Sequence, residues 1–477
     1  MINMNQMPGL SLENIAKACE GTYIGKKEDA QKVICGAVID SRQVEKDYLF
    51  IAVKGERVDG HKFIPQVFEK GALCVLSEQD LEHPAGPYIK VDSTTEAMKK
   101  LAYFYRQGLD IKVVGITGSV GKTSTKEMIS SVIAQKYRVW KTAGNFNNEI
   151  GLPLTIFGIR EEHEVAVLEM GISDFNEMHR LATMANPDIC VITNIGLCHL
   201  ENLGTRDGIL QAKTECFDHM KENGVAILNG DDDKLSTKTM VNGSPSIFYG
   251  IGETSSFHGE SELPAESTKS VYATDVVNLG FEGMKATIHT SKGEMKVHIS
   301  IPGEHNVYNA LAATAVGLEL DLSLEEIKKG IEEAKTIAGR TNLVKSNGMN
   351  IIDDCYNANP VSMAAALDVL SHATGRTIAV LGDMGELGEN EKALHFGVGE
   401  CVGEKKIHTL FCAGELAAEY KKGAQSVNPE CDIHYFKTRT EMEVALKSYV
   451  KAGDSILIKA SHFMDFPKVV ETLLASE

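Results

Sequence analysis

The sequence lacks an apolar stretch long enough to cross a membrane, which takes about 20 residues. It also lacks a basic start followed by an apolar segment, the mark of a secretory leader. No run rich in Lys and Arg offsets the formal net charge of −18, so nucleic acids and anionic membranes are disfavoured as partners. We therefore expect a cytoplasmic protein without a nucleic-acid or membrane partner.

No two of the ten cysteines have the Cys-x-x-Cys spacing that is typical of zinc sites. Cys190 and Cys412 lie inside apolar runs, as buried free thiols do. A reducing compartment explains this distribution better than disulfides or structural zinc. The last third of the chain lacks a GxGxxG motif, so it gives no support for a dinucleotide site.

The length of 477 residues suggests about three domains of roughly 150 residues each. We expect a mixed α/β domain over residues 1–110, with helices at 11–20 and 93–107 and short strands at 48–53 and 74–76. We expect a central domain over 111–338 and a third domain over 339–477. The fold class is therefore α/β with three domains.

In the central region, near-continuous apolar strands alternate with helices, which indicates a parallel sheet covered on both faces. Residues 256–300 break this pattern and predict an antiparallel β insertion, followed by a helix at 306–319. The third region returns to alternating strands and helices, as a Rossmann-like domain does.

The strongest local signal is a glycine-rich loop between the apolar strand 112–117 and an amphipathic helix. Such a loop directs backbone N–H groups at phosphate oxygens, while its lysine reaches the β- and γ-phosphates and its Thr binds Mg²⁺. Ile116 stands where the standard spacing has glycine, so an ordinary helix-capping turn is the alternative. The predicted nucleotide-binding residues are Gly118, Ser119, Gly121, Lys122 and Thr123.

Two further polar side chains follow apolar strands. Glu169 ends the run 165–168, and His199 comes shortly after the strand 189–193. Ligands of parallel sheets bind at the carboxyl ends of the strands, so both residues are candidate metal ligands beside the phosphate loop. A solvated glutamate and a structural histidine are the alternatives.

Lys213 lies on the predicted helix 207–222 and shares its face with Ile209 and Phe217. One interpretation is an apolar stem whose ammonium reaches water. The other is a functional lysine with a depressed pKa, which can react with carbon dioxide to give a carbamate that resembles a carboxylate ligand. The spacing alone does not decide between them.

These segments together resemble the Mur ligases, and the resemblance covers nearly the whole chain. The motifs that carry it include 117–123, 168–171, 193–199 and 212–215, the segment 303–310, and Gly339-Arg340. The resemblance implies ATP and two Mg²⁺ ions, with carbamylated Lys213 as a metal ligand beside Thr123, Glu169 and His199. It also implies that ATP contacts Asn306, Asn309, Arg340 and Asp354.

Three segments, 144–153, 353–360 and 381–388, resemble the branch of the family that joins D-alanyl-D-alanine to UDP-N-acetylmuramoyl-tripeptide. Asn-rich segments also form plain turns, Asp353 and Asp354 could simply end a strand, and Arg42 could be a surface charge. Residues 459–462 read Lys-Ala-Ser-His where the family commonly has Lys-Gly-Ser-Arg, which puts a role in dipeptide binding in doubt. The implied substrate-binding residues are Ser41, Arg42, Asn145, Asn147, Asn148, Tyr356, Asn357 and Asn359.

The implied reaction is ATP-dependent amide formation through an acyl phosphate, by a monomer, with Lys122, Glu169, His199 and Lys213 as the catalytic set. Two alternatives remain. One is a related ligase with another amine acceptor, such as a folylpolyglutamate synthase. The other is a nucleotide-binding regulator without catalysis.

Overall fold

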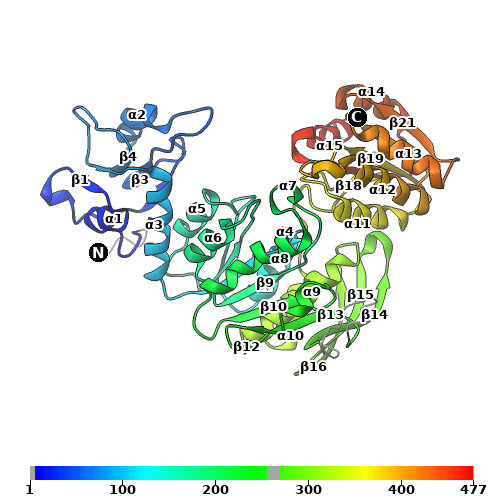
Figure 1. The fold of residues 1–477 in the computed structure, drawn as a ribbon, viewed down its shortest axis with the longest axis horizontal. Helices are drawn as coiled ribbons and strands as arrows, with labels where there is room; N and C mark the ends of the chain where they lie inside the picture. The colour runs from blue at the N-terminus through cyan, green and yellow to red at the C-terminus, as the bar shows by residue number, and fades with distance from the viewer. Residues whose placement is uncertain (1–5, 255–268, 476–477) are drawn as a thin grey trace.

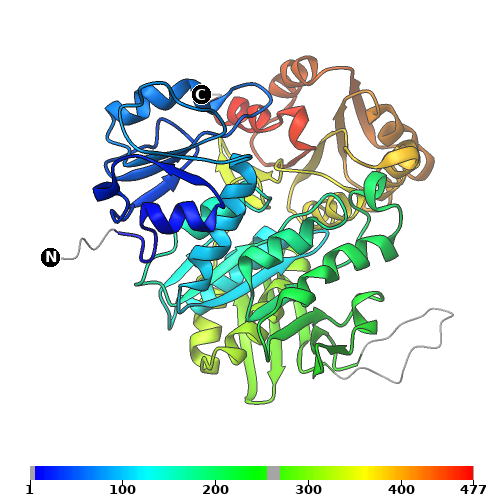
Figure 2. The same cartoon turned by 60° about the vertical axis from the view of Figure 1, so that its left-hand side comes forward.

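The computed structural model describes residues 6–254 and 269–475, which form three α/β units built on three main sheets. The N-terminal and C-terminal units both lie above the central unit, as two views show (Figure 1, Figure 2). Within the described ranges, no helix has the length and apolar character needed to span a membrane. The first part of the predicted β insertion, 256–268, lies outside the described residues.

The N-terminal unit is a five-stranded sheet in the order β1-β5-β4-β3-β2, parallel except for the β1–β5 pair. The predicted helix at 93–107 is confirmed, and Ser93 caps it by accepting a hydrogen bond from the Glu96 N–H. The strands are β1 (Thr22–Ile24), β2 (Gly36–Val38), β3 (Tyr48–Ile51), β4 (Cys74–Ser77) and β5 (Tyr88–Lys90), and the helices are α1 (Leu12–Ala18), α2 (Ile64–Glu69) and α3 (Thr94–Gln107).

The central unit contains a nine-stranded sheet in the order β16-β15-β14-β13-β10-β9-β6-β8-β7. Its first seven strands along the chain are parallel, as predicted, and the expected antiparallel strands β15 and β16 extend the sheet at one edge. The strands are β6 (Lys112–Thr117), β7 (Val139–Lys141), β8 (Val165–Glu169), β9 (Ile189–Ile192), β10 (Val225–Asn229), β13 (Ile247–Ile251), β14 (Val271–Asn278), β15 (Met284–Thr290) and β16 (Gly293–Ile299); β11 (Met240–Val241) and β12 (Ser244–Pro245) form a separate hairpin.

One predicted helix of the central unit is wrong in its extent. The segment 207–222 is not a single helix: α8 ends at Thr214, and a 3₁₀ helix, η3 (Glu215–His219), follows. The chain then turns into an extended conformation at Met220, and the Lys221 N–H bonds the Pro187 carbonyl at 2.9 Å. The helices are α4 (Lys122–Ile133), α5 (Gly151–Phe157), α6 (Glu177–Ala185), α7 (Leu200–Leu203), α8 (Arg206–Thr214), α9 (His305–Glu319) and α10 (Leu324–Glu332).

The C-terminal unit is a six-stranded sheet in the order β17-β18-β22-β19-β20-β21, parallel except for β17. The last strand, β22, lies between β18 and β19, so the end of the chain enters the middle of the sheet. The strands are β17 (Asn342–Ser346), β18 (Met349–Asp353), β19 (Arg376–Gly382), β20 (Thr409–Ala413), β21 (Asp432–Phe436) and β22 (Asp454–Lys459); the helices are α11 (Pro360–Ser371), α12 (Glu391–Glu404), α13 (Ala417–Val427), α14 (Arg439–Tyr449) and α15 (Pro467–Leu474).

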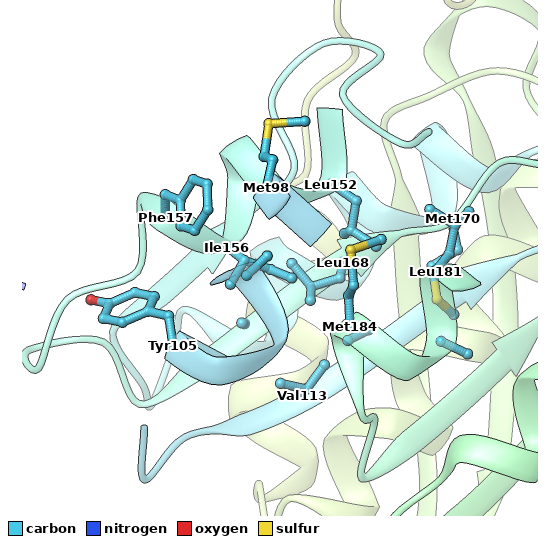
Figure 3. Close-up of a cluster of buried hydrophobic side chains, with 14 of the residues drawn as sticks. Met98, Tyr105, Val113, Leu152, Ile156, Phe157, Leu168, Met170, Leu181 and Met184 are labelled. Atoms are coloured by element: carbon cyan, nitrogen blue, oxygen red, sulfur yellow. The ribbon is translucent and has the colours of Figure 1, made fainter. Parts of the chain in front are cut away.

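The hydrophobic cores are not divided evenly among the units. One core runs from the N-terminal sheet into the central unit, where Met98 and Tyr105 of α3 pack near Ile156 of α5 (Figure 3). The C-terminal unit has its own two cores. The first two units therefore share a continuous apolar interior.

Candidate nucleotide and ligase site

The phosphate loop follows β6 and ends at the first turn of α4. Gly118 has a φ of 145°, and a Cβ there would lie 2.0 Å from the Thr193 hydroxyl, so glycine is required by both conformation and space. Gly121, with a φ of 85°, takes the N-cap position of α4. The loop thus presents the N-terminal end of α4, with its exposed N–H groups, to the space above the sheet.

Glu169 forms the centre of a polar cluster at the end of β8. The strand order β9-β6-β8 brings its carboxylate beside the phosphate loop, where Oε1 accepts hydrogen bonds from Thr123 Oγ1 at 3.1 Å and Asn147 Nδ2 at 2.8 Å. The other oxygen, Oε2, is buried without a hydrogen-bond partner among the described residues, and Lys126 Nζ lies 3.7 Å from it. A buried carboxylate oxygen of this kind is suited to a cation.

Two lysines lie close together beside this cluster. Lys122 Nζ donates to the Gly118 and Ser119 carbonyls at 2.8 and 3.3 Å, and burial lowers its pKa. Lys213 is fully buried, and its Nζ has no hydrogen-bond partner among the described residues. Burial, followed by the charge of Lys122, lowers the pKa of Lys213 from 10.5 to about 8. Lys213 therefore does not reach water, and a substantial part of its amine is neutral near pH 8.

The C-terminal unit contributes the opposite side of the site. Arg340 lies 3.8 Å from the centre of the Tyr356 ring and donates from Nη2 to Thr123 Oγ1 at 3.4 Å. Asp354 accepts from the Thr341 N–H at 2.9 Å and pairs with Lys459 Nζ at 2.7 Å. The cation Lys459 is buried because β22 lies next to β18, and this pair fixes the end of both strands.

His199 contacts the C-terminal unit directly. Its Nδ1 lies 2.8 Å from Oε2 of Glu386, which follows β19. This contact lowers the pKa of the Glu386 carboxyl. His199 thus lies at the junction between the two units rather than within the cluster around Glu169.

These groups surround one cavity of about 460 Å³ between the central and C-terminal units. Lys213 is not on its wall but buried behind it, next to Lys122 and Cys198. The structure therefore brings most of the predicted site residues together, with Lys213 as a hidden neighbour. The predicted residues that line the cavity are Ser119, Gly121, Lys122, Thr123, Asn147, Asn148, Glu169, His199, Asn309, Arg340, Asp354, Tyr356, Asn357 and Asn359.

Three predicted residues lie elsewhere. Ser41 and Arg42 belong to the N-terminal unit, where Arg42 pairs with Asp40 at 2.7 Å and the Ser41 carbonyl accepts from Lys70. Asn145 is exposed and does not line the cavity. None of the three contributes to the cavity between the other two units.

Several predicted asparagines also have local structural roles. Asn148 Oδ1 accepts from the Gly151 N–H at the start of α5, and Asn359 Oδ1 caps α11 by accepting from the Ser362 N–H. Asn309 accepts from Thr125 on α4 and donates to Asn306, which lines a small adjacent cavity. The asparagines therefore also order the elements that carry the site.

The sequence reasoning gave no site role to four residues that the structure places at or beside the site. Lys126 follows Lys122 by one helical turn, and this spacing was an available signal. Asn194 accepts from the Val120 N–H at 3.0 Å and bonds the phosphate loop to the neighbouring strand end. Lys459 and Glu386 lie in segments that the sequence analysis singled out, 459–462 and 381–388, but their contacts with the site are long-range, so the local motifs gave neither residue a role.

The donor set suits a phosphorylated ligand better than a bare metal centre. Among the described residues, no three His, Cys, Asp or Glu side chains are grouped so that they could hold a metal ion alone. Thr123 and Glu169 instead supply two oxygens on the same cavity wall as Lys122 and Arg340, a combination of oxygen ligands and cations that a phosphorylated ligand with a divalent ion would fit.

Comparisons with known proteins agree with this arrangement. Family models match residues 34–106 (Mur ligase family, catalytic domain), 116–317 (Mur ligase middle domain) and 339–462 (Mur ligase, glutamate ligase domain). The UDP-N-acetylmuramoyl-tripeptide--D-alanyl-D-alanine ligase of Bacillus subtilis is 39% identical, over 98% of both chains.

Solved structures of similar proteins cover the chain almost completely. The crystal structure of MurF from Acinetobacter baumannii has a TM-score of 0.86 and 32% identity, and covers 98% of this chain and 99% of its own. MurF ligase from Thermotoga maritima in complex with ADP has a TM-score of 0.78 and 29% identity, over 92% of this chain and 96% of its own. The matched domains and relatives together show that this chain belongs to the Mur ligase family.

Proposed function

We propose that this chain is an ATP-dependent ligase that joins D-alanyl-D-alanine to the terminal carboxylate of UDP-N-acetylmuramoyl-tripeptide, a step in the synthesis of peptidoglycan precursors. The observation that carries the proposal is one cavity in which Lys122, Glu169 and Arg340 converge from two units. The similarity to ligases with this printed activity supports the choice of substrates.

The reaction joins two groups that do not combine in water. The substrate carboxylate attacks the γ-phosphate of ATP, which forms an acyl phosphate and releases ADP. The amine of D-alanyl-D-alanine then attacks the acyl carbon, loses a proton and displaces inorganic phosphate. The chain's task is to bring a carboxylate against a triphosphate, so charge neutralisation is its main contribution.

Lys122 and Arg340 provide fixed positive charge for this approach. Lys122 now bonds to carbonyls of its own loop, and phosphate oxygens would compete for the same ammonium. Arg340 reaches the loop from the C-terminal unit, so its position depends on how that unit is placed. The arrangement thus links phosphate binding to closure of the cavity.

The oxygens of Thr123 and Glu169 fit Mg²⁺, because Glu169 Oε2 is buried and lacks a hydrogen-bond partner among the described residues. Mg²⁺ held there would supply positive charge that offsets the charge of the triphosphate. In this proposal Thr123 and Glu169 hold one ion, while Glu169, His199 and a modified Lys213 hold a second.

Modification of Lys213 would explain why a lysine is fully buried with no hydrogen-bond partner among the described residues. Its neutral amine can attack carbon dioxide; a C–N bond forms, a proton leaves, and the product is a carbamate. This adds a carboxylate to a side chain that by itself is buried behind the cavity wall. The new negative charge would lie beside Lys122, whose charge now disfavours a protonated Lys213.

We assign the remaining substrate contacts by unit. Residues 1–110, with Ser41 and Arg42, bind the uridine nucleotide; residues 111–338 bind ATP; residues 339–477 close over both. Asn147, Tyr356 and Asn357 line the cavity and are available to the peptide ends, whereas Asn145 requires movement of its loop to take part. A monomer that acts in the cytoplasm stays a prediction.

The test is phosphate release from ATP with UDP-N-acetylmuramoyl-tripeptide, with and without D-alanyl-D-alanine. We expect turnover that requires both substrates and yields the pentapeptide product. Turnover with folate and glutamate, or with a dipeptide substrate and a diaminoacid, would replace the proposed acceptor by a related one. ATP binding without acceptor-dependent release would contradict a ligase and favour a regulator.

A further inference from the structure

A contact between a histidine and a glutamate connects the loop after β9 with the loop after β19. His199 Nδ1 in the central unit lies 2.8 Å from Glu386 Oε2 in the C-terminal unit. Both side chains line the nucleotide cavity, although Glu386 is 62% exposed and makes no other ion pair among the described residues. Its position is therefore not explained by packing of its own unit.

Both partners have a strained backbone. His199 has a φ of 51° and Glu386 a φ of 61°, in the left-handed region that side chains other than glycine rarely adopt. Strain of this kind persists where surrounding structure enforces it, and it gathers at functional sites. Here it occurs on both sides of one contact.

Each partner is anchored in a rigid part of its own unit. On the central side, the Val120 N–H bonds Asn194 Oδ1 at 3.0 Å, and the Gly196 N–H bonds Ser119 Oγ at 2.9 Å. The loop that carries His199 is therefore joined to the phosphate loop. On the other side, the Gly385 N–H, adjacent to Glu386, bonds Ser461 Oγ at 2.9 Å, next to the end of β22.

We propose that Glu386 is a positioning residue that holds His199 when the C-terminal unit closes, and thereby couples closure to the phosphate loop. A carboxylate against Nδ1 fixes the orientation of the imidazole ring and leaves Nε2 for a ligand in the cavity. Nε2 has no hydrogen bond to a described residue. The inference rests on the proposed function for the identity of that ligand, but the coupling itself does not.

The experiment compares Glu386→Gln with the matched control Glu389→Gln, an exposed glutamate three residues further along the chain. Amide hydrogen exchange is followed in the full-length protein with and without the non-hydrolysable analogue AMP-PNP and Mg²⁺. In the parent protein we expect the analogue to slow exchange in both 194–204 and 383–388. In Glu386→Gln we expect that protection to fall about tenfold in both segments, and in the control to stay unchanged.

Exchange in the segment 194–204 decides the outcome, because this segment belongs to the central unit whereas Glu386 belongs to the C-terminal unit. If Glu386→Gln changes exchange only within 383–388, Glu386 does not act through His199 and the proposal is wrong. Glu386→Gly separates contact from strain: it removes the pair and relieves the backbone, so we expect the same loss of coupling without loss of thermal stability. Retained coupling in Glu386→Gly would also overturn the proposal.

Kinetics give a second readout. In phosphate-release assays we expect Glu386→Gln to lower kcat about tenfold, and the double variant His199→Ala/Glu386→Gln to be no slower than His199→Ala alone. Losses that multiply would show an independent role for Glu386 and contradict the proposal. Since hydrogen exchange needs only analogue binding, a failed ligase assay would refute the proposed substrates and leave the test of coupling intact.

Discussion

The N-terminal unit shares a hydrophobic core with the central unit, whereas the C-terminal unit has two cores of its own and meets the central unit around the cavity. At the first junction, α3 packs against α5 and α6 in a core shared by both units (Figure 3). The second junction includes the His199–Glu386 pair and the hydrogen bond from Arg340 to Thr123, and we call it the polar junction. Phe281 of the central unit also packs against the C-terminal core there.

The difference assigns different mechanical roles to the two outer units. Separating the N-terminal unit from the central unit would expose the shared apolar core to water. This exposure costs about 25 cal/mol per Å² of apolar surface, so the N-terminal unit is held in place. Exposed ion pairs contribute only about 0–1 kcal/mol each, so the C-terminal unit can separate at low cost. The site lies at the second junction, where closure can assemble it and opening can release products.

The largest expected effect is on catalysis without an effect on stability, and it concerns Lys122 at the polar junction. Lys122→Ala removes the ammonium nearest the phosphates, and we expect kcat to fall by at least on the order of 10³-fold. The melting temperature should stay unchanged, because the lysine bonds only to its own loop. Phosphate release and thermal unfolding measure the two quantities. Lys112→Ala, at the start of the strand β6 that precedes the phosphate loop, is the control. An unfolded Lys122→Ala protein would indicate a structural role instead.

The next prediction tests whether the C-terminal unit unfolds separately from the joint N-terminal and central body. Ile156 lies in the shared core and Leu370 in the core of the C-terminal unit, and both are fully buried. Truncation of either to alanine costs about 2–5 kcal/mol. In calorimetry we expect two transitions, with Ile156→Ala lowering that of the joint N-terminal and central body, and Leu370→Ala lowering the other. One transition that both variants shift equally would contradict the comparison.

The parts of the site that the sequence predicted are those with local signals. The apolar strand before Gly118, the glycine-rich loop and the helix after Thr123 are contiguous, so sequence order and spatial order coincide. Glu169 could also be placed, because adjacent parallel strands end at the same edge of a sheet. The positions of these residues in the structure follow from elements that sequence periodicity alone predicts.

What the sequence could not show depends on strand order and on loops. Lys459 meets Asp354 because β22 inserts between β18 and β19, and no pattern near residue 459 encodes that insertion. Glu386 reaches His199 through positive φ angles at both residues, which no pattern in the sequence predicts. The helix at 207–222 was predicted too long because an apolar stripe fits a 3₁₀ turn as well as an α-helix.

A third prediction concerns the buried amine behind the polar junction. The pKa of Lys213 is lowered from 10.5 to about 8 in the folded protein. The unfolded chain therefore binds a proton at this lysine more tightly than the folded protein does. The resulting loss of stability, up to about 3 kcal/mol, is fully present below pH 8 and fades as the pH rises to 10.5. In carbon dioxide-free buffer we therefore expect Lys213→Met to be more stable than the parent at pH 7, but not at pH 10.5.

The same variant tests the carbamate. We expect Lys213→Met to have no turnover, and added bicarbonate to stabilise the parent protein but not the variant, as measured by chemical denaturation at pH 7.5. Full activity of Lys213→Met would remove the carbamate from the mechanism. A difference in stability that does not change with pH would show that packing, rather than the buried charge, determines the effect.

The smallest expected effect comes from a test of whether the ring of Tyr356 sets the position of Arg340. Tyr356→Ala removes the ring that lies 3.8 Å from the guanidinium, and the lost cation–π contact is worth about 1 kcal/mol. Without the ring, Arg340 has to be ordered when ATP binds, so we expect KM for ATP to rise about fivefold while the melting temperature stays the same. Tyr356→Phe keeps the ring and should retain the parent KM for ATP. If instead both variants raise KM for the dipeptide and leave KM for ATP unchanged, the tyrosine contacts the dipeptide through its hydroxyl and does not set the position of Arg340.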